Sequence, residues 1–126
     1  MKVRQRIIDV HAHVIPGVDD GSRTMEESVE MLKRAADQGI VGVIATPHYS
    51  RRHVLKGLND SAKLLQQEIR KTYPKFRIFP GQETFYHDEL AQRLNEGKAY
   101  TMADSQYVLV EFMPSVSYEI LFRRQP

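Results

Sequence analysis

The sequence predicts an α/β fold built from parallel βα units. Strand-like and helix-like periodicities alternate along the whole chain of 126 residues, and the run IVGVIA at 40–45 is almost entirely apolar. Such a run is typical of a strand buried on both faces of a parallel sheet. Strands that alternate with helices form parallel sheets with right-handed crossovers. We therefore expect the order β-α-β-α-β-α-β-α in one domain, residues 1–126.

The first strand is predicted at 6–14, in RIIDVHAHV. Alternation with a period of two residues places Asp9, His11 and His13 on one face. The opposite face should pack against a helix, because its side chains are all apolar: Ile8, Val10, Ala12 and Val14. Three further strands are predicted at 40–45, at 77–80 and in YVLVEF at 107–112.

The first helix is expected from Thr24, where Thr24-x-x-Glu27 matches a capping box, to about Gln38. A second amphipathic helix should begin at 58 and end before Pro74, because four apolar residues there have helical spacing: Leu58, Ala62, Leu65 and Ile69. Shorter helices are expected at 89–95 and 118–123. Four further apolar side chains are assigned to the core: Met25, Met31, Phe76 and Phe79.

Composition excludes several classes of function. With 18 Lys+Arg against 16 Asp+Glu the formal net charge is +2 and the basic residues are scattered, so no nucleic-acid surface is indicated. The absence of cysteine excludes disulfides, thiolate metal sites and a cysteine nucleophile. No apolar run approaches 18 residues and the first residues do not resemble a signal peptide. We expect a soluble, cytoplasmic protein that does not insert into a membrane.

Nitrogen and oxygen ligands lie at or just after the carboxyl end of every predicted strand. The candidate metal ligands are His11, His13, Asp20, His48, Glu83 and Glu111. Because parallel strands bring these ends to one rim, the six side chains should converge there. A mixed N/O set without sulfur favours Mn, Fe, Zn or Mg. Clusters of such ions lower the pKa of a bound water and hold a phosphoryl group during in-line attack.

Simpler explanations exist for most of these residues. Asp19 and Asp20 can form a turn with Gly21, and this is the role we favour for Asp19. His48 after Pro47 can simply end a strand, and Glu83 can belong to a surface turn.

For two carboxylates the sequence predicts a specific kind of contact. Glu111 lies in a strand predicted to be buried, where an ionised carboxylate needs a cation or a hydrogen-bond partner. Asp9 is expected behind the ligands, as a hydrogen-bond acceptor for one of the imidazoles.

Four stretches also resemble a known family. IDVHAHVIPGVDDG at 8–21, ATPH at 45–48, PGQE at 80–83 and VEF at 110–112 are similar to the bacterial PHP-domain protein-tyrosine phosphatases of capsule and exopolysaccharide loci. The resemblance covers nearly the whole chain and implies the N-terminal half of a (β/α)7 TIM-like barrel. The family completes its site with later His-Pro-Glu-Arg and Asp-x-His motifs, which these residues lack, so we expect a truncated domain.

The resemblance also implies a trinuclear site, usually run with Mn²⁺. His11, His13 and Glu83 would hold one ion, and Glu83 would bridge to a second ion that also takes Glu111. Asp20 and His48 would hold the third. Arg51 and Arg52 either contact the substrate phosphate or belong to an exposed basic loop.

The implied activity is hydrolysis of phosphotyrosine in proteins by a metal-bound hydroxide, with the tyrosine-rich tail of a bacterial tyrosine kinase as substrate. One alternative keeps the fold and changes the substrate, as in histidinol-phosphate phosphatases of the same superfamily. The other is a non-catalytic fragment that binds metal or acts only by association. Four strands cannot close a barrel, so 107–112 should be an open edge through which the chain self-associates.

Overall fold

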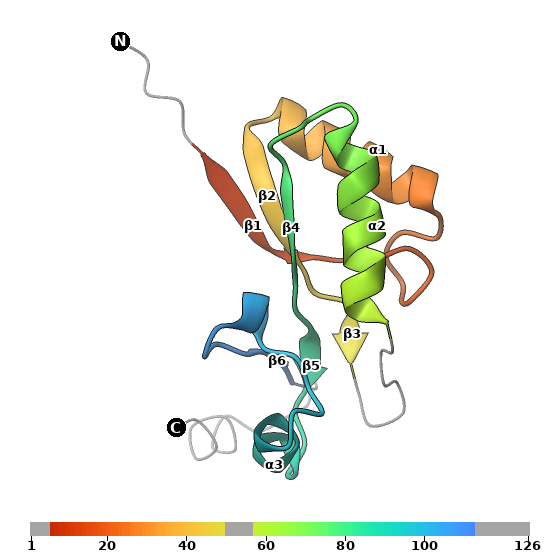
Figure 1. Cartoon of the computed structure of the whole chain (residues 1–126). Helices are drawn as coiled ribbons and strands as arrows, with labels where there is room; N and C mark the ends of the chain where they lie inside the picture. Colours follow the sequence, from red (N-terminus) through yellow and green to blue (C-terminus); the bar gives the residue numbers. More distant parts are fainter. Residues whose placement is uncertain (1–5, 50–56, 113–126) are drawn as a thin grey trace.

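Parallel strands and helices alternate along residues 6–49 and 57–112, which are the residues that the computed structural model describes (Figure 1). The elements in chain order are β1 (Ile7–Ala12), α1 (Met25–Asp37), β2 (Ile40–Ala45), β3 (His48–Tyr49), α2 (Leu58–Arg70), β4 (Arg77–Pro80), β5 (Glu83–Phe85), α3 (Leu90–Asn95), the 3₁₀ helix η1 (Met102–Asp104) and β6 (Leu109–Glu111). The predicted α/β class with parallel strands is confirmed. The helix predicted at 118–123 lies outside the described residues.

The strands form two three-stranded parallel sheets, β1-β2-β4 and β3-β5-β6. Two predicted strands cross from the first sheet into the second after a two-residue break. β2 continues as β3 after Thr46 and Pro47, and β4 continues as β5 after Gly81 and Gln82. Figure 1 shows β3, β5 and β6 beyond the carboxyl ends of β2 and β4. The break brings the second sheet to the rim where the sequence places its polar residues.

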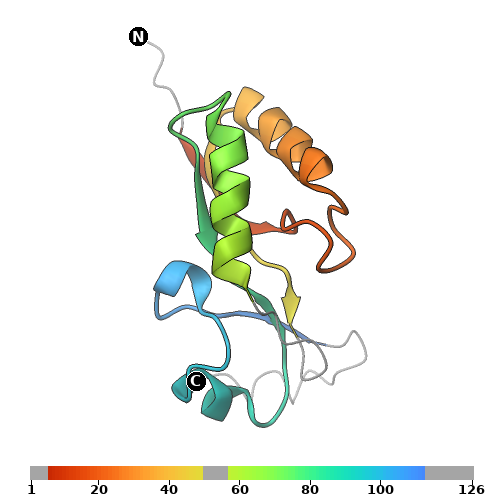
Figure 2. The same cartoon turned by 45° about the vertical axis from the view of Figure 1, so that its right-hand side comes forward.

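Helices α1 and α2 lie together on one side of the first sheet (Figure 2). The Thr24 side chain accepts a hydrogen bond from the Glu27 N–H at 3.1 Å, as the capping box predicts. All four apolar residues that marked the second helix are buried in α2. The core between sheet and helices consists of Val14, Ile15, Leu32, Val43, Ala45, Leu58, Ala62, Leu65, Ile69, Phe76 and Ile78. No helix within 6–49 and 57–112 is long and apolar enough to cross a membrane.

The predicted alternation in the first strand is wrong at Ile8 and Val10. Their exposed fractions are 49% and 56%, whereas Val14 is buried as expected. Asp9 pairs with Val43 and Ala12 pairs with Ala45, so three steps in β1 match two steps in β2. One extra residue in a strand reverses the alternation that follows it. Because Val14, after the shift, is buried in the helix-covered core, Ile8 and Val10 lie on the opposite face of the sheet.

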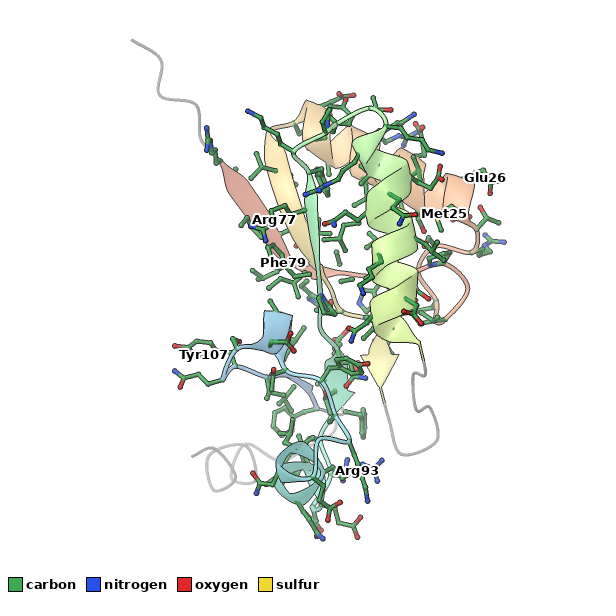
Figure 3. The ribbon with its side chains drawn as sticks, in the orientation of Figure 1. Met25, Glu26, Arg77, Phe79, Arg93 and Tyr107 are labelled. Carbon is green, nitrogen blue, oxygen red and sulfur yellow. The ribbon has the colours of Figure 1, made fainter. Side chains whose placement is uncertain are left out.

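Two of the residues assigned to the core lie outside it. Met31 is 40% exposed on α1. Phe79 points to the same side of β4 as Arg77, away from α2 (Figure 3), and the Arg77 guanidinium lies 4.8 Å from the centre of its ring. Phe76 is buried, and Met25 packs against the core.

Candidate metal centre

The six predicted ligands lie where the two sheets meet. His11 is in β1, His13 follows that strand, and Asp20 is in the loop before α1. The other three come from the second sheet: His48 is in β3, Glu83 begins β5 and Glu111 ends β6. His48 pairs with Glu83, and Glu83 pairs with Leu109, two residues before Glu111. Paired residues, and residues two apart in one strand, lie on the same face of a sheet. The His48 imidazole and the Glu83 and Glu111 carboxylates therefore point to the same side.

Glu83 is the central carboxylate. Its Oε2 lies 3.0 Å from His11 Nε2, 3.0 Å from His13 Nε2 and 3.5 Å from His48 Nδ1. Its side chain is 12% exposed. One oxygen thus faces imidazoles from both sheets, although residue 83 is 72 positions from residue 11. His11, His13 and His48 therefore converge at one rim, as the sequence predicts.

His48 extends the cluster on both sides of its ring. Its Nδ1 is 3.2 Å from Glu111 Oε2 and its Nε2 is 3.3 Å from Asp20 Oδ1. The His13 and His48 rings stack with centroids 4.5 Å apart. The Glu111 side chain is 39% exposed, so the expectation that it is buried in its strand is wrong, but its carboxylate does have a partner.

The donor atoms form three overlapping groups, each within 4.8 Å: His11, His13 and Glu83; His13, Asp20 and His48; His48, Glu83 and Glu111. Bonds from Zn²⁺ to nitrogen or oxygen are roughly 2.0–2.2 Å long, so two ligands of one ion lie about 3–4 Å apart. The Nε2 atoms of His11 and His13 are 3.2 Å apart, within that range. The residues therefore fit small divalent cations in number, type and spacing.

Asp19 has the turn role predicted for it and also a contact that sequence reasoning missed. Its Oδ2 lies 3.0 Å from His13 Nδ1 and accepts the His48 backbone N–H at 3.1 Å. Its Oδ1 accepts the Gly21 N–H at 2.9 Å. Burial acts to raise the pKa of Asp19, but the hydrogen bonds from His13, Gly21 and His48 outweigh burial and lower that pKa below its usual value. Asp19 is thus a contact of the site as well as a turn residue.

Asp9 does not occupy the place predicted for it. Its Oδ1 accepts the backbone N–H of His11 at 3.0 Å instead of facing an imidazole nitrogen. The carboxylate that contacts an imidazole nitrogen is that of Asp19. The loop after β1 folds back onto the end of that strand, where the Ser22 N–H donates to the His13 carbonyl at 3.3 Å. The sequence signal for this return is the glycine at 21, where a Cβ would lie 2.3 Å from the His13 carbonyl oxygen.

The Thr-Pro-His stretch positions His48 through its backbone. The Thr46 N–H donates to the Ala12 carbonyl at 2.8 Å, and the buried Thr46 hydroxyl oxygen accepts the Ala12 N–H at 3.0 Å. The Pro47 carbonyl accepts the Glu83 N–H at 3.0 Å. Both strands that carry a ligand into the second sheet are therefore tied at the break itself.

The Gly-Gln-Glu stretch has a matching role for Glu83. A Cβ at Gly81 would lie 2.9 Å from Ile44 Cγ2 and 3.2 Å from Met102 Sδ, so only glycine fits between β2 and η1 without displacing them. Gln82 is buried, and its Oε1 accepts the Tyr100 N–H at 2.8 Å. Arg51 and Arg52, the predicted phosphate contacts, lie outside the described residues.

The chain is similar to proteins named tyrosine-protein phosphatases. The tyrosine-protein phosphatase YwqE of Bacillus subtilis (strain 168) is 32% identical over 109 residues, which are 84% of this chain and 43% of that protein. The tyrosine-protein phosphatase CpsB of Streptococcus pneumoniae is 31% identical over 120 residues, which are 89% of this chain and 47% of that protein. The chain thus spans about half the length of these relatives.

A solved structure gives the same result for the fold. It is one of the crystal structures of YwqE from Bacillus subtilis and CpsB from Streptococcus pneumoniae, two proteins described as unique metal-dependent tyrosine phosphatases. The match has a TM-score of 0.81 at 32% identity and covers 90% of this chain and 48% of that chain. The family described as capsular polysaccharide synthesis, CpsB/CapC, matches residues 7–124. The chain therefore belongs to the CpsB/CapC family.

Proposed function

We propose that this chain carries the metal centre of a metal-dependent protein-tyrosine phosphatase that acts in capsule or exopolysaccharide regulation. The observation that carries the proposal is the convergence of six donor side chains in three overlapping groups at the junction of two sheets. The relatives named tyrosine-protein phosphatases supply the substrate class. With no cysteine in the chain, a cysteinyl-phosphate route is not open to it.

The family resemblance suggests Mn²⁺ as the cofactor, and the mixed N/O donor set suits Mn, Fe, Zn or Mg. His11, His13 and Glu83 would hold one ion, Glu83 and Glu111 a second, and Asp20 and His48 a third. Bound divalent ions lower the pKa of water and offset the charge of a phosphoryl group. The His48 ring contacts both Glu111 and Asp20, which supports a place for His48 between the second and the third ion.

The barrel interpretation is also part of this proposal. Residues 1–126 would form the N-terminal half of a (β/α)7 TIM-like PHP barrel, and the parallel strands and the match to about half of a solved chain support it. The tyrosine-rich tail of a bacterial tyrosine kinase as substrate, phosphate contacts from Arg51 and Arg52, and a cytoplasmic location stay predictions.

The test is hydrolysis of a phosphotyrosine peptide and of p-nitrophenyl phosphate by the chain. Turnover should require Mn²⁺, disappear after chelation with EDTA and return when Mn²⁺ is added back, while thiol reagents have no effect. Activity that survives exhaustive chelation would falsify the metal mechanism. Turnover of histidinol phosphate in preference to phosphotyrosine favours the alternative substrate, and Mn²⁺ binding without turnover favours the non-catalytic fragment.

Glu83→Gln is the sharpest variant because one Glu83 oxygen faces three imidazoles. It should reduce turnover and Mn²⁺ affinity by at least about 10-fold. Glu30→Gln is the matched control, since Glu30 is 60% exposed on α1 and pairs only with Arg34 among the described contacts. Equal losses in the two variants would contradict a role for Glu83 in the site.

A further inference from the structure

Asp19 is a buried carboxylate that receives donors from three segments. Its side chain is 5% exposed. The donors are the His13 ring at 3.0 Å, the His48 backbone N–H at 3.1 Å and the Gly21 backbone N–H at 2.9 Å. These segments carry or flank predicted ligands of different groups, and Asp20 is the next residue in the chain.

The His13 ring lies between two carboxylates, those of Asp19 and Glu83. Asp19 Oδ2 faces Nδ1 and Glu83 Oε2 faces Nε2, both at 3.0 Å, so an ion held at Nε2 would leave Nδ1 as the nitrogen that bears the proton and donates to Asp19. In a neutral imidazole with a proton on Nδ1, the Nε2 atom keeps its lone pair. That Nε2 is the atom 3.0 Å from Glu83 Oε2 and 3.2 Å from His11 Nε2.

The loop that presents Asp19 has no room to adjust. A Cβ at Gly21 would meet the His13 carbonyl oxygen at 2.3 Å and the His13 Cβ at 2.6 Å, so this turn packs directly on the strand end. The two oxygens of Asp19 divide the donors between them: Oδ1 holds the turn, and Oδ2 holds the His13 ring and the start of β3. The position of the carboxylate is therefore fixed relative to both strands.

We infer that Asp19 is a positioning residue of the metal centre: it holds His13 as the Nδ1–H tautomer with Nε2 directed at the ligand cluster, and it fixes the His48 backbone beside it. The inference rests on the proposed function, because it assigns Asp19 a role toward the ions of that site. Its side chain contacts His13, Gly21 and His48, so its role is to position these groups.

The decisive variant is Asp19→Asn, which keeps the shape and replaces one oxygen by an NH₂ group. If that NH₂ faces His13, Nδ1 must accept and the proton moves to Nε2, the atom directed at the cluster. Long-range ¹H–¹⁵N spectra of the chain loaded with Zn²⁺, a diamagnetic ion, report the tautomer. The wild type should show His13 with the proton on Nδ1, and the variant should lose that pattern.

Mn²⁺ titration followed by EPR is the second readout. Asp19→Asn should weaken Mn²⁺ binding roughly 10–100-fold, the range found when a hydrogen-bond partner of a ligating histidine is removed. Asp60→Asn, an exposed position in the first turn of α2, is the matched control and should bind as the wild type does. Asp9→Asn should cost less than Asp19→Asn, because Asp9 holds a backbone N–H and no imidazole.

Neither readout depends on phosphatase activity. Equal Mn²⁺ affinity in the wild type and Asp19→Asn overturns the role of Asp19 and leaves the proposed function standing. Failure of the wild type to bind Mn²⁺ overturns both. Where Asp19→Asn does not fold by circular dichroism, the wild-type spectrum still decides, since His13 with its proton on Nε2 is incompatible with the inference.

Discussion

Two fully buried threonines near the metal centre differ in what surrounds their hydroxyl groups. Thr46 and Thr84 both have an exposed fraction of 0%. The Thr46 oxygen accepts the Ala12 N–H at 3.0 Å, whereas the Thr84 hydroxyl has no hydrogen-bond partner within the described part of the chain. A buried hydroxyl without a partner keeps its full desolvation cost. The same substitution at the two positions should therefore have opposite effects.

Thr84→Val should leave the free energy of unfolding unchanged or raise it by about 1 kcal/mol, because valine fills the same space without a hydroxyl and suits a strand. Thr46→Val should lower it by about 1–3 kcal/mol, since the Ala12 N–H loses its acceptor. Urea unfolding of both variants measures the difference. A loss at Thr84 as large as that at Thr46 would show that the Thr84 hydroxyl is satisfied in solution.

At this scale the candidate ligands could be predicted, and the residue behind them could not. Histidines and carboxylates at strand ends are visible in the sequence because strand direction brings such ends together. The turn role of Asp19 was predicted, but its contact with His13 was not, because where a turn residue points depends on the tertiary return of the loop to His13. The alternation that suggested Asp9 fails at the register shift between Asp9 and Ala12.

At the scale of elements, a side-chain hydrogen bond joins α1 to the segment between α2 and β4. The Tyr73 hydroxyl donates to Asp37 Oδ1 at the end of α1. This hydrogen bond to Asp37, followed by burial, raises the pKa of Tyr73 above its usual value of 10.0. A group with a raised folded pKa stabilises the fold below its unfolded pKa, and that contribution is lost as the pH rises through the folded pKa.

Tyr73→Phe should therefore lower the thermal midpoint at neutral pH, with a difference from the wild type that shrinks above about pH 10. Absorbance titration should also lose a late tyrosinate signal, because the hydrogen bond to Asp37 raises the pKa of Tyr73 above its usual value. Tyr107→Phe, at a side chain 68% exposed, is the control and should change neither result. An unchanged late titration in Tyr73→Phe would rule out the bond to Asp37 in solution.

The longer elements could be predicted closely and the short ones could not. The expected first helix ends one residue beyond α1, and the buried face of α2 is the predicted one. β3 has two residues and β5 has three, too few for a period to be seen, and η1 has none of the helical spacing that marks the others. β6 covers only 109–111 of the predicted 107–112.

At the scale of the whole molecule, the described helices cover one face of the first sheet (Figure 2). Ile8 and Val10 are about half-exposed, and Phe79 points away from α2 (Figure 3). Within the described residues no α-helix lies over this face (Figures 1 and 2). Exposed apolar surface of this kind favours association. Self-association stays a prediction, to which the exposed sheet face now adds a second surface beside the edge at 107–112.

Val10→Lys should shift the chain toward the monomer, because a charge at this position opposes burial of the sheet face against another molecule. Leu64→Lys is the matched control: Leu64 is 55% exposed, but on α2, on the other side of the sheet. Light scattering at matched concentrations measures the molecular mass. A wild type that is already monomeric, or an equal shift in both variants, would contradict association through this face.

The position of the candidate ligands across two sheets would link binding of an ion to local opening of the chain. His11 and His13 come from the end of β1, whereas His48, Glu83 and Glu111 belong to a sheet whose strands have only two or three residues. An ion that binds only the closed form of the chain stabilises that form by RT ln(1 + [ion]/Kd). Ions held between the sheets should therefore slow hydrogen exchange at the Glu83 and Tyr86 amides, which donate across the second sheet, far more than in the middle of α1.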